Sequence, residues 1–134
     1  MLRKDLIMRQ FEEFGKVLAA LLSLRKAANF TEFENELEKA SLVFLEIEFS
    51  SFLKDDTNQF LQIVSALAPE KKKMLARLLY EKMLLAEQQA NIDYAQGLAE
   101  KSKIAYELYQ NDQTHLEYDL DAHYKLQELR NRIN

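Results

Sequence analysis

Residues that form turns are almost absent from this chain, which contains two glycines and one proline among its 134 residues. A β-sheet protein needs such residues at each hairpin, so their scarcity favours a few long helices with short connections. A chain of this length with 48% hydrophobic residues can bury a sizeable core without disulfide bonds. The sequence therefore predicts a single all-α domain over residues 1–134, folded as a helical bundle or short α-solenoid.

The spacing of the apolar residues places about six helices along the chain. We expect them at residues 3–27, 31–54, 58–67, 70–89 and 92–109, and from Thr114 to about residue 132. Residues 1–68 then hold the N-terminal helices, and residues 69–134 hold a helical hairpin with a closing helix. The closing helix is expected to bury one apolar stripe, formed by Tyr118, Ala122, Leu126, Leu129 and Ile133.

Short polar signals mark where several of these helices begin. Thr31 and Thr114 are each followed three residues later by a glutamate, which is the spacing of a capping box. Asn29 is the alternative start of the second helix, and Asp55, Asp56 and Thr57 predict a break with a new cap. Pro69 suits the first position of the fourth helix.

Both glycines lie inside predicted helices, where each costs on the order of 1 kcal/mol relative to alanine. Gly15 is therefore expected to mark a crossing with another helix. Gly97 lies on the fifth helix, whose inner face is built largely from small residues, namely Ala95, Ala99, Ser102 and Ala105. This pattern predicts a close approach between two helix backbones.

The charge balance excludes several classes of partner. A formal net charge of −4 gives no general attraction to nucleic acid or to an anionic membrane. Charged residues interrupt the apolar run near the N-terminus, so it fits neither a signal peptide nor a membrane span. The chain has no cysteine, which removes disulfide and thiolate chemistry. We expect a cytoplasmic protein.

The hairpin at about residues 75–110 resembles a tetratricopeptide repeat, a helix–turn–helix with small residues where its helices cross. The resemblance is carried by Leu79, Ala90-Asn91-Ile92, Ala95 and Glu100-Lys101-Ser102, whereas the pattern is not followed at Met83, Ala86 and Ala99. The opening LRKDLIMRQFEEFGKVLA is similar to the start of small uncharacterised bacterial helical proteins, which form domains of unknown function. The repeat-like hairpin implies a protein-interaction module.

Two groups of residues are candidates for partner binding. The first is a basic run, Lys71, Lys72, Lys73 and Arg77, which lies at a helix start where cations oppose the helix dipole. An acidic partner, the acidic second helix of this chain or of another copy, or plain solvation would each account for it. The second group is an open groove beside the fifth helix, lined by Tyr94, Lys103 and Tyr106.

His115, Asp119 and His123 lie four residues apart in succession on one strip of the last helix. Histidine and aspartate at this spacing can reach a common metal ion, so the three are weak candidates for a metal site. The competing interpretation is a solvated face with His–Asp pairing. No catalytic constellation and no cofactor motif is found, so the chain is not expected to be an enzyme.

Three functions remain open on the sequence alone. The first is a non-enzymatic protein-interaction or scaffold module, with a protein partner or a second copy of the chain. The second is a small-ligand or metal-binding protein that uses His115, Asp119 and His123. The third is a structural subunit of a homo-oligomer.

Overall fold

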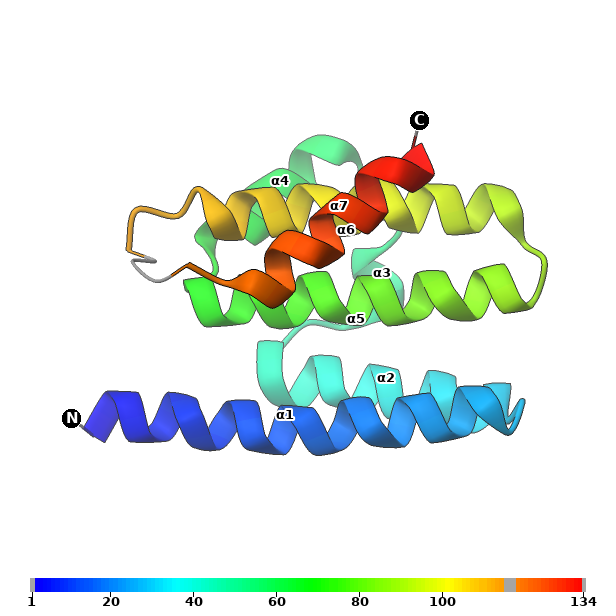
Figure 1. Ribbon diagram of the computed structural model, residues 1–134, viewed down its shortest axis with the longest axis horizontal. Coiled ribbons are helices and arrows are strands. Elements are labelled where there is room, and N and C mark those ends of the chain that lie inside the picture. The colour runs from blue at the N-terminus through cyan, green and yellow to red at the C-terminus, as the bar shows by residue number, and fades with distance from the viewer. Residues whose placement is uncertain (1, 115–117, 134) are drawn as a thin grey trace. The chain divides into compact units, whose positions relative to one another are not determined.

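The computed structural model describes residues 2–114 and 118–133, and all regular structure in these ranges is helical. Seven helices are present there: α1 (Leu2–Lys26), α2 (Phe30–Leu45), α3 (Phe49–Phe52), α4 (Thr57–Ala66), α5 (Pro69–Gln88), α6 (Ile92–Gln110) and α7 (Leu120–Ile133) (Figure 1). The predicted all-α fold is confirmed. The helices form two compact units, Met1–Asp55 and Asp56–Asn134, so α4 belongs with the hairpin rather than with the N-terminal helices.

The first unit is a hairpin of α1 and α2 followed by the short helix α3. Phe14 of α1 meets Phe44 of α2 edge to face, with ring centroids 5.3 Å apart. Within this unit no helix crosses α1 at Gly15, contrary to the expectation, because nothing lies within 4 Å of the position that its Cβ would take. Gly97 of α6 is equally open, so it takes no part in the close approach that the small residues of α6 predict. The small residues beside Gly97 are nevertheless buried.

The second predicted helix is interrupted, which corrects its expected end near residue 54. It stops at Leu45 because Glu46 adopts a left-handed conformation with a φ of 58°, and the Ile47 N–H then bonds back to the Ser41 carbonyl. The Ser41 hydroxyl also donates to the Ile47 carbonyl at 2.7 Å. Glu38 reaches across and accepts from the backbone N–H groups of Phe49 and Ser50, at 3.1 and 2.7 Å, so its carboxylate caps α3.

The predicted helix starts are confirmed in part. Asp56 caps α4 through a full capping box with Gln59, and Pro69 opens α5. Asn29 caps α2, whereas Thr31 lies inside that helix and forms no capping box. The last helix begins at Leu120 rather than after Thr114, so Tyr118 lies before it, not on its buried stripe.

The second unit is built on the antiparallel pair α5 and α6, with α4 against α6 and α7 lying along the pair (Figure 1). The Ser102 hydroxyl of α6 donates to the Ala76 carbonyl of α5 at 2.9 Å, a buried bond that joins the two backbones. Helix α7 contributes Ala122, Leu126 and Leu129 to the core.

Candidate interaction surface on the last helix

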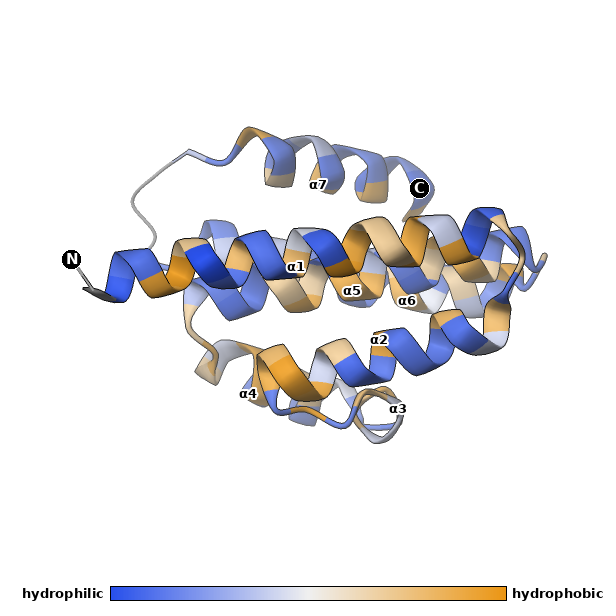
Figure 2. Ribbon diagram, turned by 90° about the horizontal axis from the view of Figure 1, so that it is seen from below, coloured by the Kyte–Doolittle hydropathy of each residue, from blue (hydrophilic) through white to orange (hydrophobic). Residues whose placement is uncertain are grey.

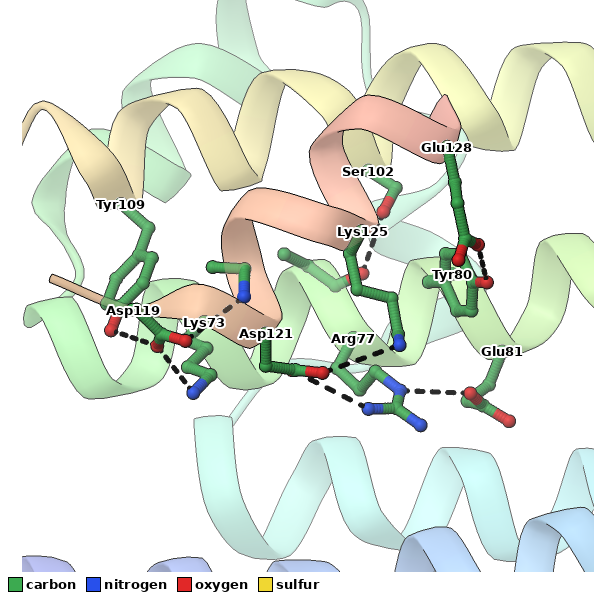
Figure 3. Close-up of polar contacts among 12 residues, drawn as sticks. Lys73, Arg77, Tyr80, Glu81, Ser102, Tyr109, Asp119, Asp121, Lys125 and Glu128 are labelled. Atoms are coloured by element: carbon green, nitrogen blue, oxygen red, sulfur yellow. Dashed lines mark hydrogen bonds and ion pairs between the residues drawn. The ribbon is translucent and has the colours of Figure 1, made fainter. Parts of the chain in front are cut away.

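The start of α7 is fixed by Asp119. Its carboxylate accepts the Ala122 N–H at 3.0 Å, as an N-cap does, and also the Tyr109 hydroxyl at 2.7 Å. The Lys73 ammonium lies 2.6 Å from the same carboxylate (Figure 3). Burial alone would raise the pKa of Asp119, but the hydrogen bonds from Lys73 and Tyr109 outweigh it and lower that pKa.

Further along, polar contacts tie α7 to α5. Arg77 lies 4.0 Å from Asp121, the Tyr80 hydroxyl donates to Glu128, and Arg132 binds Glu87 at 2.9 Å (Figure 3 shows the first two). We call these contacts, with Lys73–Asp119, the α5–α7 polar strip. In these pairs, residues further along α5 contact residues further along α7. Helix α7 therefore runs parallel to α5.

Helix α6 holds the other side of α7. Arg130 lies 3.2 Å from Glu107, and the Gln96 amide donates to the Arg132 carbonyl at 2.9 Å. With the buried Ala122, Leu126 and Leu129, these bonds set the rotation of α7 about its own axis. The side of the helix turned away from α5 and α6 is thereby determined.

That outward side carries a cluster of large exposed residues. Tyr118, Leu120 and Tyr124 expose 75%, 54% and 59% of their surface. The His123 ring lies between the two tyrosines, with its centroid 6.0 Å from that of Tyr118 and 5.7 Å from that of Tyr124. We call these four residues the α7 aromatic patch. Sequence periodicity did not find it, because Tyr118 and Tyr124 also fit the edge of a helical stripe.

Three cations of the basic run, Lys72, Lys73 and Arg77, have carboxylate partners inside the second unit. The buried Lys72 ammonium lies 2.5 Å from Asp112, in the connection between α6 and α7. That hydrogen bond, together with those from Thr114, holds the pKa of Asp112 well below its usual range. Lys73 lies on Asp119, and Lys71 is half-buried. The acidic residues of α2 are therefore not needed to explain these cations.

Arg77 lies at the centre of a mixed polar and aromatic group. Its guanidinium is 3.0 Å from the buried Glu81 carboxylate and 5.8 Å from the centre of the Tyr80 ring. Burial lowers the pKa of Arg77, but the attraction and hydrogen bond of Glu81 exceed that effect and raise it. Tyr106 is fully buried nearby, and its hydroxyl has no hydrogen-bond partner among the described residues. Burial raises the pKa of Tyr106.

The three residues expected to line an open groove beside α6 do not do so together. Tyr106 is fully buried and Lys103 is half-buried, while Tyr94 is exposed with the Lys82 ammonium 6.0 Å from its ring centre. Helix α7 packs along α6 where the groove was expected.

The residues proposed for a metal site have other contacts or lie outside the described ranges. Asp119 is engaged by Lys73, Tyr109 and the α7 backbone, and His123 contacts two tyrosine rings. His115 lies outside the described residues. Among residues 2–114 and 118–133, no three His, Cys, Asp or Glu side chains gather closely enough to hold a metal ion.

Comparison with models of protein families found no match, and neither did searches of curated proteins and of solved structures. Within the described part of the chain, no helix has the length and apolarity needed to cross a membrane.

Proposed function

We propose that this chain is a non-enzymatic protein-interaction module that binds its partner through the α7 aromatic patch. The observation that carries the proposal is the exposure of Leu120 and Tyr124 on α7 and of Tyr118 just before it, on a helix whose opposite side is packed against α5 and α6. Tyrosine is enriched at the energetic centres of protein interfaces, because its ring offers a large contact area and its hydroxyl a hydrogen bond. The hairpin's resemblance to a tetratricopeptide repeat also supports a binding role.

The rigidity of α7 supports the proposal further. A side chain that is already placed loses less conformational freedom when a partner binds, which leaves more of the contact energy for affinity. Asp119 and the α5–α7 polar strip hold the patch in position before any partner arrives. Because the patch contains no lysine, arginine or carboxylate, we expect an apolar or aromatic partner surface rather than nucleic acid. The absence of cysteine favours a cytoplasmic setting.

The test is site-specific photocrosslinking in the native cell. A benzophenone amino acid placed at position 124 is expected to capture one discrete partner, identified by mass spectrometry. The matched control carries the same group at Asn131, which is exposed two turns further along α7. Capture that is equal at both positions, or absent at position 124, would remove the patch as the contact surface.

A second arm separates binding from folding. Tyr124→Asp places a charge on an exposed position, so the helix content should be unchanged while the captured partner is lost. Gln127→Asp provides the control at a neighbouring exposed position. No described contact favours a small-ligand or metal-binding function, so it is not carried forward.

A further inference from the structure

Helix α7 lies on the α5–α6 hairpin through a narrow apolar contact. Three of its fourteen residues are buried, namely Ala122, Leu126 and Leu129, whereas α5 buries eleven of twenty and α6 seven of nineteen. The three follow one another at intervals of four and three, which are the anchor positions of a helix bound in a groove. In Figure 2, most of the visible ribbon of α7 is hydrophilic. Helix α7 is therefore an amphipathic helix seated by one apolar seam.

The hairpin face under the start of α7 is basic. The Tyr109 hydroxyl of α6 donates to the Asp119 carboxylate at 2.7 Å, and the Lys73 ammonium of α5 lies 2.6 Å from the same group (Figure 3). One turn further along α5, Arg77 lies 4.0 Å from Asp121. This end of the face therefore receives the carboxylates of a helix start, where acids also suit the helix dipole.

The far end of the same face has the opposite charge. Glu87, the last residue but one of α5, accepts from Arg132 at 2.9 and 3.3 Å. Between the two ends, the Tyr80 hydroxyl donates to Glu128, and the Lys125 ammonium lies 5.1 Å from the centre of the Tyr80 ring. Because the cations and the anion lie at opposite ends of α5, a helix with acids first and an arginine last fits in one direction only, parallel to α5.

The polar contacts of α7 are of a kind that can be exchanged. The Arg77 and Asp121 side chains expose 26% and 51% of their surface, and the pair of Arg132 and Glu87 is similarly exposed. Ion pairs with this exposure are weak and are screened by salt. A helix of fourteen residues is also marginal in isolation, so α7 owes its helical form to its docked position.

The hairpin has contacts of its own that do not involve α7. The Ser102 hydroxyl of α6 donates to the Ala76 carbonyl of α5 at 2.9 Å, and α4 packs against α6. These contacts hold α5 and α6 together whether or not α7 covers them.

We infer that the hairpin face under α7 is a docking site for an amphipathic helix of a partner protein, and that α7 occupies this site in cis. The helix that fits carries carboxylates at its start, apolar residues at intervals of four and three, and an arginine near its end. Binding of such a helix displaces α7, and in its absence α7 keeps the site closed. The inference does not rest on the α7 aromatic patch, which lies on the opposite side of α7. All of the contacts that carry it lie within the second unit.

The experiment measures binding of a fluorescein-labelled peptide with the sequence of residues 118–133 to the full chain, by fluorescence anisotropy. The natural chain is expected to bind the peptide weakly, because its site is open for only a fraction of the time. Leu126→Asp in the chain removes the seam of the cis helix and should tighten peptide binding at least about tenfold. Gln127→Asp, at the neighbouring exposed position, is the control and should bind the peptide as the natural chain does.

A covalent lock tests whether α7 must leave for the peptide to bind. The chain has no cysteine, so a bismaleimide linker can join Glu107→Cys of α6 to Arg130→Cys of α7 without reacting elsewhere. The two natural side chains lie 3.2 Å apart. Linking should weaken peptide binding at least about tenfold relative to the same variant before linking. Equal binding before and after linking would overturn the inference.

Changes in the peptide test the orientation and the face that binds. Asp119→Lys in the peptide should weaken binding to the Leu126→Asp chain at least about tenfold, and Lys73→Glu in that chain should restore it, because the pair is re-formed with reversed sign. Tyr124→Asp in the peptide should leave binding unchanged, because Tyr124 lies on the other side of the helix. A charge exchange that fails to restore binding would overturn the parallel placement. A loss of binding with Tyr124→Asp would move the contact to the α7 aromatic patch and overturn the inference.

Amide hydrogen exchange in the natural chain gives a test that needs no substitution. The amides of α7 should exchange at least about tenfold faster than those of α5 and α6, and faster still in about 500 mM salt, because the ion pairs are then screened. Exchange in α7 that is as slow as in α5 and α6 at low and high salt would overturn the inference, and so would a folded Leu126→Asp chain that does not bind the peptide.

Discussion

In the second unit, one tyrosine hydroxyl is hydrogen-bonded and another is buried without a hydrogen bond. Tyr106 and Tyr80 lie on facing helices, and the two hydroxyls differ in their surroundings. The Tyr80 hydroxyl donates to Glu128, whereas the Tyr106 hydroxyl is buried and has no partner in the part of the chain that the structure describes. A buried polar group that lacks a hydrogen bond costs free energy, while a satisfied one contributes modestly.

Tyr106→Phe is therefore expected to leave the free energy of unfolding unchanged or to raise it by about 1 kcal/mol, because the unsatisfied hydroxyl disappears and the ring is kept. Tyr80→Phe, which removes a satisfied hydroxyl, should lower it by about 1 kcal/mol. Urea titration followed by circular dichroism measures both. A loss of more than 1 kcal/mol (roughly one hydrogen bond) in Tyr106→Phe would mean that its hydroxyl has a partner in solution.

Gly97 is the clearest position for stabilising the chain with a single methyl group. It lies inside α6, and a Cβ there meets nothing within 4 Å. Gly97→Ala should raise the free energy of unfolding by about 1 kcal/mol, since alanine restricts the unfolded chain and favours the helix. The change is measured as a shift in thermal and urea midpoints. Destabilisation would instead indicate the close helix contact that the sequence pattern predicted.

At the scale of whole helices, the backbone conformation just after each helix determines where the helix ends. Within residues 2–114 and 118–133, three residues other than glycine adopt positive φ, each directly after a helix or one residue further on: Ala28, Glu46 and Ala90. Glycine would be favoured at all three, yet both glycines lie within helices. The helix ends therefore depend on their surroundings more than on their own residue preferences.

Ala90 makes this testable in the turn between α5 and α6. Its φ is 59°, a conformation that costs a residue with a Cβ about 1–2 kcal/mol. Ala90→Gly should raise the free energy of unfolding by about 0.5–1 kcal/mol, after the greater freedom of glycine in the unfolded chain is subtracted. Gln89→Gly is the matched control, because Gln89 has a φ of −81° and should only lose stability. Equal effects at both positions would contradict the left-handed turn.

Helix α7 depends on Asp119 more than on any other polar residue of the α5–α7 polar strip. Asp119→Ala removes the cap, the Tyr109 bond and the Lys73 ion pair together, and should lower stability by about 2 kcal/mol. Asp119→Asn keeps an acceptor for the backbone and should cost less, about 1 kcal/mol. Amide hydrogen exchange in α7 reports the effect locally. Gln127→Ala, at an exposed position of α7 outside the polar strip, is the control and should leave exchange in α7 almost unchanged.

For the molecule as a whole, acid should be more damaging than the net charge of −4 suggests. Lys72 and Thr114 depress the pKa of Asp112, and for Asp119 the bonds from Lys73 and Tyr109 outweigh burial, so its pKa also falls. A carboxyl group whose pKa is lower in the folded state stabilises the fold above its unfolded pKa, which is about 3.9 for aspartate. That stabilisation is lost as the pH falls from about 4 towards the folded-state pKa values.

Urea midpoints measured at about pH 7, 5, 4 and 3 should therefore be nearly constant down to pH 5 and then fall. The double variant Asp112→Asn/Asp119→Asn should start lower and show a shallower decline below pH 4, because it lacks the two carboxyl groups that titrate there. An equally steep decline in the variant would assign the acid sensitivity to other carboxyl groups.

Sequence reasoning reached the helical fold because its signals are local. The period of apolar residues, Asp56 before α4 and Pro69 at the start of α5 act within one or two turns of a helix. It missed the break after Leu45, because that stop is made by contacts six to twelve residues apart, from Ser41 and Glu38. No glycine or asparagine stands next to Leu45 to signal the end of this helix.

The α7 aromatic patch could not be predicted from the sequence for the same reason. Periodicity alone could assign Tyr106 to a groove and Tyr118 to a core stripe. Their actual places, buried and exposed, depend on where α7 begins and on which side of it faces α5 and α6. Those choices are made by Asp119 with Lys73 and by Arg132 with Glu87, pairs separated by more than forty residues.

The sequence by itself determined that the chain is helical, where most of its helices lie and that its second half forms a hairpin. These outcomes follow from hydrophobic spacing and from caps, which act between near neighbours. Only the tertiary structure decided which lysines and arginines form ion pairs and which tyrosines are exposed. It also decided that the predicted second helix ends at Leu45 and is followed by the separate helix α3. Such outcomes depend on burial and on pairs of distant charges, whose free energies exist only once the helices have packed together.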